Sequence, residues 1–472
     1  MNKKEINLNK TKNYYRNLLI YLLFINSSFF ISFRIFKKDK TNKNFSPYSP
    51  EIKTIKIGNE ESAKIGIISD FQLDSGHHRK ISKYFEDNLR RALQYFKKNN
   101  IDIIIIAGDI THRGKRLDFL LYNTIFYSVY DLNDNKNPIV ISLMGNHDYM
   151  DKKYKKIENQ QKFFNYMKSY PYSHFIINDY NFIFWGNNNS DINDNEIQNY
   201  NWIKSTLEKA RKNKKNEGDP IFVITHIPPK NTVYGSEGMW GHKGIFETLK
   251  NYPEVICLSG HSHYSLRNIK SIWQGNFTVI NTQSLSYVDL DYDYKNHMEV
   301  RINSAKNDSI GLIAYLNKEN VVFERIEFLT EEILEEKWKI DFPINISNFI
   351  YTYDKRNKKI KPYFKDKSEI KIEKIKETSF YNNYMKNYIV FKAAIHVDYV
   401  YMYKILLKNN NNNGNNKILK YYSDYYKNKK LRKDIMRYEL PNEIINGKYN
   451  VEIFAIDSFN NTSEPLIGDI DI

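Results

Sequence analysis

The sequence of 472 residues contains one cysteine, Cys257, which excludes an intramolecular disulfide. The fold therefore cannot be a disulfide scaffold, although a location outside the cytoplasm stays open. Cys257 stands within an apolar run, V-I-C-L-S, and this context predicts a role in core packing rather than in chemistry.

Long hydrophobic runs are also scarce. Residues 18–33 are mostly apolar, are interrupted by Asn26, Ser27 and Ser28, and have basic residues on both sides. The run is shorter than the roughly 20 residues of a spanning helix, so residues 1–36 read as a signal peptide or a signal anchor. We expect an uncleaved anchor because no small-x-small cleavage site follows. An ordinary amphipathic helix is disfavoured because the run shows no polar face.

The middle of the chain lacks an excess of either charge. The formal net charge is +16, but the basic excess lies in residues 1–40 and 341–472. A nuclease would concentrate basic residues beside its active site, so no nucleic acid substrate is expected. The larger basic flank before residue 18 favours an inside amino terminus and an extracytoplasmic body, membrane-anchored or secreted.

The patterning divides the rest of the chain into three parts. Residues 37–62 are polar, contain Pro47 and Pro50, and are interpreted as a linker. Residues 63–340 alternate apolar strand-like runs with helical periodicity, which predicts an α/β layered domain. Residues 341–472 contain short alternating segments, which predict a β-sandwich. Its last segment, G-K-Y-N-V-E-I-F-A-I-D, resembles fibronectin type III or immunoglobulin-like modules.

Five apolar runs in residues 63–340 end at polar residues that are able to bind metals. In chain order the runs end in S-D-F-Q, A-G-D, M-G-N-H-D, T-H and S-G-H-S-H. Ligands bind at the carboxyl ends of strands in open α/β sheets, and carboxylate, amide and imidazole donors suit divalent metals. A single polar strand end is usually a turn or a helix cap, but five in series favour a metal site.

The series D-x-Q, G-D, G-N-H-D, H and G-H-x-H resembles the calcineurin-like metallophosphoesterases over roughly residues 63–335. The resemblance implies a two-sheet sandwich flanked by helices, to which the sequence adds a carboxyl-terminal all-β sandwich. It further implies two divalent ions about 3.5–4 Å apart that hold a hydroxide for attack on phosphorus. The family's first motif is usually D-x-H, and Gln72 stands in the place of that histidine.

Ligand roles follow residue by residue from the resemblance. It assigns Asp70, Gln72 and His263 to the first ion, Asn146, His226 and His261 to the second ion, and Asp109 to both. Because the first set is rich in oxygen donors, manganese is favoured, with iron, zinc and magnesium as alternatives.

The motif also contains candidate catalytic residues. His147 follows a ligand and is expected to be the general acid for the leaving oxygen, and Asp148 is expected to orient it through a hydrogen bond. Turn structure is the alternative for His147. Arg113, Tyr234 and Trp240 are candidate substrate contacts; a surface salt bridge is the alternative for Arg113, and packing is the alternative for the aromatic residues.

The sequence thus predicts a dinuclear hydrolase of phosphate esters whose substrate is not identified. A cell-surface polymer or a lipid is a candidate for the phosphorylated substrate. Independently, an adhesion role for the sandwich is one interpretation, and it would hold the enzyme at a surface polymer. Two alternatives stay open. One is a nuclease or cyclic-nucleotide phosphodiesterase on the same fold, and the other is a non-catalytic surface-binding protein.

Overall fold

The computed structural model describes most of the chain after residue 41. The described residues are 42, 44–57, 62–76, 79–131, 136–186, 194–293, 298–302, 309–365, 368–378, 383–409, 416–444 and 446–472. The predicted signal peptide or anchor at residues 1–36 lies outside them. Within this described part, no helix is long and apolar enough to cross a membrane.

Two mixed β-sheets form the centre of the predicted catalytic domain. The first has the order β1 (Lys53–Ile55), β5 (Tyr172–Ile177), β6 (Tyr180–Trp185), β7 (Ile221–Thr225), β8 (Val255–Ser259), β10 (Thr278–Asn281) and β9 (Ile272–Gln274). The second has the order β15 (Glu332–Ile333), β14 (Asn320–Glu327), β13 (Ile310–Asn317), β2 (Ser62–Ile68), β3 (Ile103–Ile106) and β4 (Ile139–Ser142), with β16 (Trp338–Asp341) also paired to β14. β2, β3 and β4 are parallel, as are β6, β7, β8 and β10.

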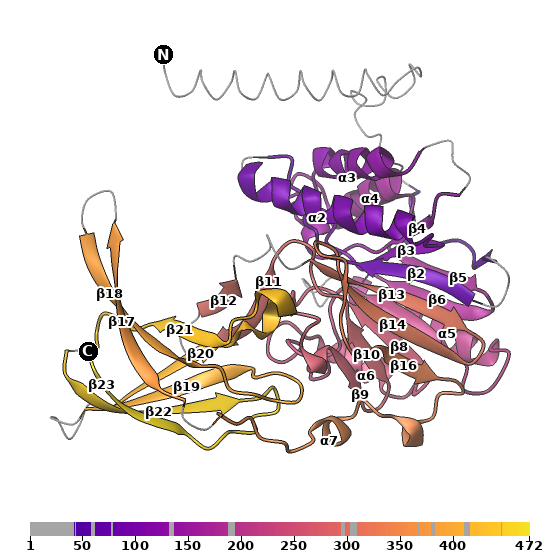
Figure 1. Cartoon of the computed structure of the whole chain (residues 1–472). Coiled ribbons are helices and arrows are strands. Elements are labelled where there is room, and N and C mark those ends of the chain that lie inside the picture. The colour runs from indigo at the N-terminus through magenta and orange to yellow at the C-terminus, as the bar shows by residue number, and fades with distance from the viewer. Residues whose placement is uncertain are drawn as a thin grey trace, which may run out of the picture. The chain divides into compact units, whose positions relative to one another are not determined.

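Helices cover the outer faces of both sheets. They are α2 (Arg79–Lys98), α3 (Arg116–Val129), α4 (Lys156–Met167), α5 (Asp194–Lys212) and α6 (Lys243–Leu249). Figure 1 shows α2, α3 and α4 over the face that carries β3 and β4. α4 follows a turn and ends before Lys168, whose φ of 55° is left-handed.

Three apolar cores hold these layers together. One core lies between the sheets and includes Ile67 and Ile105 of the second sheet with Phe184 and Ile224 of the first. The second core joins the second sheet to α2, α3 and α4, and the third joins the first sheet to α5 and α6. The predicted α/β sandwich flanked by helices is therefore confirmed, and its parallel strand ends meet at one edge.

Both ends of the predicted catalytic segment extend further than the sequence suggested. β1 lies in the predicted linker and pairs with β5, and Tyr48 stacks on Tyr172 at a ring distance of 4.7 Å. At the other end, Phe349 and Tyr351 lie in the core between the sheets. The core of this domain therefore includes side chains before residue 63 and after residue 340.

The carboxyl-terminal segment forms two antiparallel sheets. One contains β17 (Ile370–Thr378), β18 (Asn383–Lys392) and β21 (Ile435–Glu439), and the other contains β20 (Lys417–Tyr422), β19 (Met402–Asn409), β22 (Lys448–Ile456) and β23 (Leu466–Asp471). Their apolar core includes Ile389, Ile405 and Val451. The predicted β-region is present, and its kinship with fibronectin or immunoglobulin modules stays a prediction.

Candidate metal centre

The ends of parallel strands bring the predicted ligands together. Asp70 and Gln72 follow β2, Asp109 follows β3, Asn146 follows β4, His226 follows β7, and His261 and His263 follow β8. Glycines allow the loops to approach closely. A Cβ atom at Gly145 would lie 2.1 Å from Oδ1 of Asp109, and one at Gly108 would lie 2.4 Å from Nδ1 of His226.

The backbone at these strand ends is strained. Positive φ angles occur at Asp70 (53°), Gln72 (42°), Asp109 (51°), His261 (68°) and His263 (58°). Such angles are uncommon for residues other than glycine, and each costs on the order of 1–3 kcal/mol. The surrounding fold therefore imposes these conformations, which turn the side chains toward one another, and concentrated strain of this kind is typical of functional sites.

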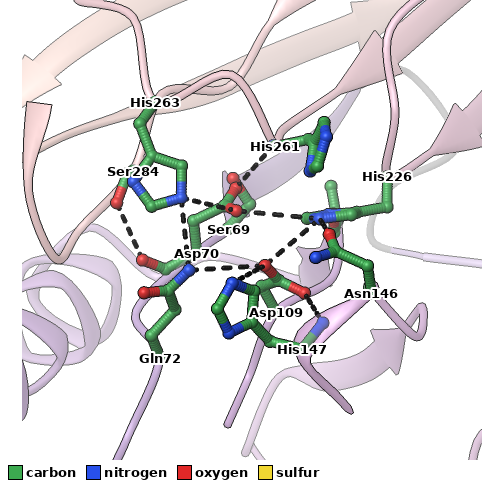
Figure 2. Close-up of polar contacts among 12 residues, drawn as sticks. Ser69, Asp70, Gln72, Asp109, Asn146, His147, His226, His261, His263 and Ser284 are labelled. Carbon is green, nitrogen blue, oxygen red and sulfur yellow. Dashed lines mark hydrogen bonds and ion pairs between the residues drawn. The ribbon is translucent and has the colours of Figure 1, made fainter. Parts of the chain in front are cut away.

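The centre of the site is a buried group of Asp70, Asp109 and His226, whose ligand atoms all lie within 4.8 Å of one another. Nε2 of His226 lies 3.3 Å from Oδ2 of Asp109 and 3.8 Å from Oδ1 of Asp70. Figure 2 shows the other predicted ligands converging on this group. Nε2 of His263 lies 3.1 Å from Oδ1 of Asp70, and Oδ1 of Asn146 lies 3.0 Å from Nε2 of His226.

Backbone carbonyls orient two of the imidazoles. Nδ1 of His226 donates to the carbonyl of Ala107 at 2.9 Å, and Nδ1 of His263 donates to the carbonyl of Tyr287 at 3.2 Å. A proton on Nδ1 leaves the lone pair of Nε2 facing the carboxylates. Metal-binding histidines are usually held in this way, because the outer hydrogen bond fixes both the tautomer and the ring orientation.

The electrostatics of the group favour a cation. Burial alone would raise the pKa of Asp109, but the charge of His226 outweighs it and holds that pKa below its usual range. Burial alone would lower the pKa of His226, but the charges of Asp109 and Asp70 raise it to about 10. Two buried carboxylates thus attract positive charge strongly at this position, as a metal site requires.

The donor set fits divalent ions. Oδ1 of Asp70 is buried and has no hydrogen-bond partner among the described residues, although two imidazole nitrogens lie near it. Gln72 is 2% exposed, and its Nε2 lies 3.4 Å from Oδ2 of Asp109 and 3.3 Å from Nε2 of His263. A half-turn of this amide would direct its oxygen toward the same point. Oxygen and imidazole donors therefore surround the Asp70 carboxylate.

The structure contradicts the predicted contact between Asp148 and His147. Oδ1 of Asp148 accepts hydrogen bonds from the N–H and the hydroxyl of Thr111, and Oδ2 accepts from the N–H groups of Ile110 and Gly145. Asp148 is fully buried, so it fixes two ligand loops to each other instead of orienting an imidazole.

His147 is oriented by a backbone group that its sequence motif does not contain. Its Nδ1 donates to the carbonyl of His112 at 2.9 Å, and its backbone N–H donates to Oδ1 of Asp109 at 2.8 Å. Nε2 lies 3.9 Å from Oδ2 of Asp109, and 21% of the side chain is exposed. His147 therefore lies at the edge of the centre, where it is able to reach a bound ligand.

The three predicted substrate contacts have different environments. The prediction for Tyr234 is wrong, because its side chain is buried and its hydroxyl contacts the hydroxyl of Tyr401 in the sandwich. Trp240 is half-buried, and its ring lies 5.3 Å from that of His261. Arg113 is exposed on the loop after Asp109. Trp240 and Arg113 stay predicted contacts.

Sequence reasoning missed a sixth polar strand end. The segment N-T-Q-S-L-S follows β10, and Oγ of Ser284 donates to the carbonyl of Asp70 at 2.8 Å (Figure 2). The N–H of Ser286 donates to the same carbonyl at 3.2 Å. Gln283 has a φ of 54°, like the ligand residues. The signal was an apolar run closed by polar residues, the same pattern that revealed the other five.

A buried Asp/Asp/His group that could hold a metal ion thus lies at the strand ends of a two-sheet α/β sandwich. Residues 63–265 match the family described as Calcineurin-like phosphoesterase. An uncharacterized protein of Methanocaldococcus jannaschii is 29% identical over 224 residues, which cover 43% of this chain and 86% of that protein.

Solved structures with similar folds include two phosphatases. A dimetal phosphatase from Danio rerio aligns with 59% of this chain and 99% of its own, at 12% identity and a TM-score of 0.39. A purple acid phosphatase from yellow lupin aligns with 59% of this chain and 54% of its own, at 10% identity and a TM-score of 0.40. The match over residues 63–265 confirms the resemblance to calcineurin-like phosphoesterases that the motifs predicted.

Proposed function

We propose that this protein hydrolyses phosphate esters with two divalent ions bound at the strand ends. The observation that carries the proposal is the convergence of Asp70, Asp109 and His226, whose ligand atoms lie within 4.8 Å of one another. The family match of residues 63–265 supports the same class of reaction. When bound, such ions neutralise phosphate charge and activate water.

The positions of the side chains support two neighbouring ion sites. Asp70, Gln72 and His263 lie to one side of Asp109, and Asn146, His226 and His261 lie to the other (Figure 2). Oδ2 of Asp109 lies between Nε2 of His226, at 3.3 Å, and Nε2 of Gln72, at 3.4 Å. This central position suits a carboxylate that is shared by both sites.

His147 is the residue that we assign to proton transfer. The hydrogen bond from Nδ1 to the carbonyl of His112 fixes the ring and leaves Nε2 facing the centre, 3.9 Å from Oδ2 of Asp109. When the imidazole is protonated, Nε2–H is able to donate to the oxygen that leaves with the departing group. A positioned acid of this kind contributes typically about 10²–10⁴-fold to the rate.

The charge distribution favours substrates other than nucleic acids, since the excess of basic over acidic residues lies outside the predicted catalytic segment. We propose a small phosphorylated compound, a lipid or a surface polymer as substrate, and manganese as the preferred ion. A location at the outer side of a membrane, through residues 1–36, belongs to the same proposal.

A turnover panel tests the function. The full-length protein is stripped with a chelator, reloaded with manganese or zinc, and assayed on a phosphomonoester, a phosphodiester and a pyrophosphate, with Asp109→Asn as the matched inactive variant. We expect hydrolysis of at least one substrate class that depends on added metal and is absent in Asp109→Asn. A metal-loaded wild type that hydrolyses none of them would support the non-catalytic alternative.

A further inference from the structure

The start of β11 (Val288–Asp293) contacts one of the predicted metal ligands directly. The carbonyl of Tyr287 accepts the Nδ1 proton of His263 at 3.2 Å, and the N–H of Asp289 donates to the carbonyl of His263 at 3.0 Å. The rings of Tyr287 and His263 are 4.1 Å apart. The direction of Nε2 of His263 therefore depends on where this short segment lies.

The opposite side of the same segment is held by two tyrosines. The carbonyl of Leu290 accepts a hydrogen bond from the hydroxyl of Tyr234, and the hydroxyl of Tyr401 lies 3.4 Å from the same carbonyl. The two hydroxyls also lie within hydrogen-bonding distance of each other, so the Tyr401 proton goes either to the carbonyl or to Tyr234. Tyr234 belongs to the loop after His226, whereas Tyr401 directly precedes β19 of the sandwich.

These contacts belong to an apolar and aromatic cluster that joins the two domains. Its buried members, which we call the junction cluster, are Tyr234, Tyr264, Val288, Leu290, Tyr401 and Tyr425. The ring of Tyr234 lies 4.5 Å from that of Tyr264, the residue after His263. The N–H of Ile269 donates to the hydroxyl of Tyr399 at 3.3 Å, which adds a polar contact across the same boundary.

We propose that Tyr401 is a positioning residue for the first metal site, acting through the start of β11 on His263. The proposal rests on the proposed function, because it assumes that His263 binds an ion. When Tyr401 loses its hydroxyl, the buried carbonyl of Leu290 loses one of its two hydroxyl contacts, so the segment shifts toward its remaining partner Tyr234. Any movement of residues 287–290 shifts the position of the Tyr287 carbonyl, to which Nδ1 of His263 donates. The sandwich is then part of the active centre, although it contributes no ligand.

Tyr403 provides a matched comparison on the same chain segment. Its hydroxyl is also buried, but it accepts the N–H of Ala394 at 3.0 Å, within the sandwich. Its ring packs in the core of the sandwich beside Phe391, at 5.0 Å. Tyr403→Phe therefore removes a buried hydroxyl that has no contact with β11, whereas Tyr401→Phe removes a buried hydroxyl that contacts the carbonyl of Leu290 in β11.

The test is a manganese titration of the metal-free full-length protein and of both variants by calorimetry. Asn146→Ala removes a donor of the second site, so the binding step that this variant leaves unchanged belongs to the first site. We expect Tyr401→Phe to weaken the first step about tenfold, the low end of the range for outer partners of ligands, and to leave the second unchanged. Tyr403→Phe should leave both steps unchanged.

A double substitution sharpens the test. Because both hydroxyls bind the carbonyl of Leu290, the effects of Tyr234→Phe and Tyr401→Phe should not add. Unchanged binding in Tyr401→Phe, or an equal loss in Tyr403→Phe, would overturn this proposal while the proposed function stands. A wild type that binds no manganese would instead overturn the proposed function.

Discussion

The catalytic domain and the carboxyl-terminal sandwich use their strands differently. In the sandwich, β22 alternates buried and partly exposed residues, and Val451 and Ile453 face an apolar core. In the catalytic domain, strands such as β3 and β7 are buried along their whole length and end in buried charge at Asp109 and His226. Alternating burial is typical of a sandwich strand with one face in the core. Full burial followed by charged residues at the strand end is typical of a binding site in an α/β sheet.

The backbone shows the same contrast. Asp70, Asp109 and His263 hold φ angles of 53°, 51° and 58° at strand ends. Among the described residues of 341–472, positive φ angles of residues other than glycine occur at Lys359, before the first sandwich strand, and at Asn460, in a turn that asparagine tolerates well. Strain and buried charge thus coincide at the strand ends of one domain, and such a coincidence is typical of functional sites.

The largest effect is expected at the shared carboxylate. Asp109→Ala removes the oxygens that lie between the two predicted ion sites, so metal content and turnover should both fall below detection. Elemental analysis after dialysis against manganese measures the metal content. The control is Asp469→Ala on β23, which should change neither metal content nor turnover. Two retained ions in Asp109→Ala would refute the assignment of this residue.

Two glycines give the next comparison. Gly145→Ala places a Cβ atom 2.1 Å from Oδ1 and 2.4 Å from the backbone N of Asp109. Overpacking costs about 1–3 kcal/mol and should displace the ligand, so stability and metal affinity should fall together. Gly468→Ala in the sandwich meets only side-chain atoms of Ile370, at 3.3 Å or more, and should be nearly neutral. Denaturant unfolding with and without manganese measures both variants; equal behaviour would remove the contrast between the domains.

His147→Ala should separate catalysis from binding. No hydrogen bond from its side chain holds Asp70 or His226 in the described structure, so both ions should stay bound. The rate should fall about 10²–10⁴-fold for poor leaving groups and less for activated aryl esters, which need little protonation. A leaving-group series with metal analysis of the same samples measures this. Equal losses along the series would count against a general acid.

Gln72→His should give the smallest change. An imidazole nitrogen in place of the amide suits borderline ions, so the first site should bind zinc more tightly relative to manganese. We expect a shift in the affinity ratio of about tenfold, or ~1.4 kcal/mol. Competition titrations of Gln72→His and Gln72→Ala measure it. If Gln72→Ala matches the wild type for both ions, the amide is not a ligand and water takes its place.

The sequence indicated the candidate metal ligands better than it indicated the groups that orient them. The strand ends were predictable because an apolar run followed by Asp, Asn or His is a local pattern, and parallel strands bring such ends together. The partners of the imidazoles were not, because the carbonyls of Ala107, His112 and Tyr287 carry no side-chain signature.

Tertiary packing decided the cases that the sequence reading missed. Tyr234 stands in a loop between two ligand strands, which suggested a substrate contact, but it packs against Tyr401, far away in sequence. Asp148 follows His147 directly, yet its carboxylate turns toward Thr111. Phe349 and Tyr351 follow a change in composition but return to the core of the catalytic domain. The position of each of these side chains depends on contacts between segments that are distant in the sequence.

The central claim is that these strand ends form a two-ion hydrolytic centre, and a joint measurement of occupancy and rate tests it most directly. Manganese is titrated into the metal-free full-length protein while bound metal and hydrolysis of a responsive phosphate ester are followed in the same samples. The account predicts two ions per chain and a rate that rises as the second ion binds. Hydrolysis that is independent of manganese, or two bound ions with no hydrolysis of any phosphate ester, would contradict it.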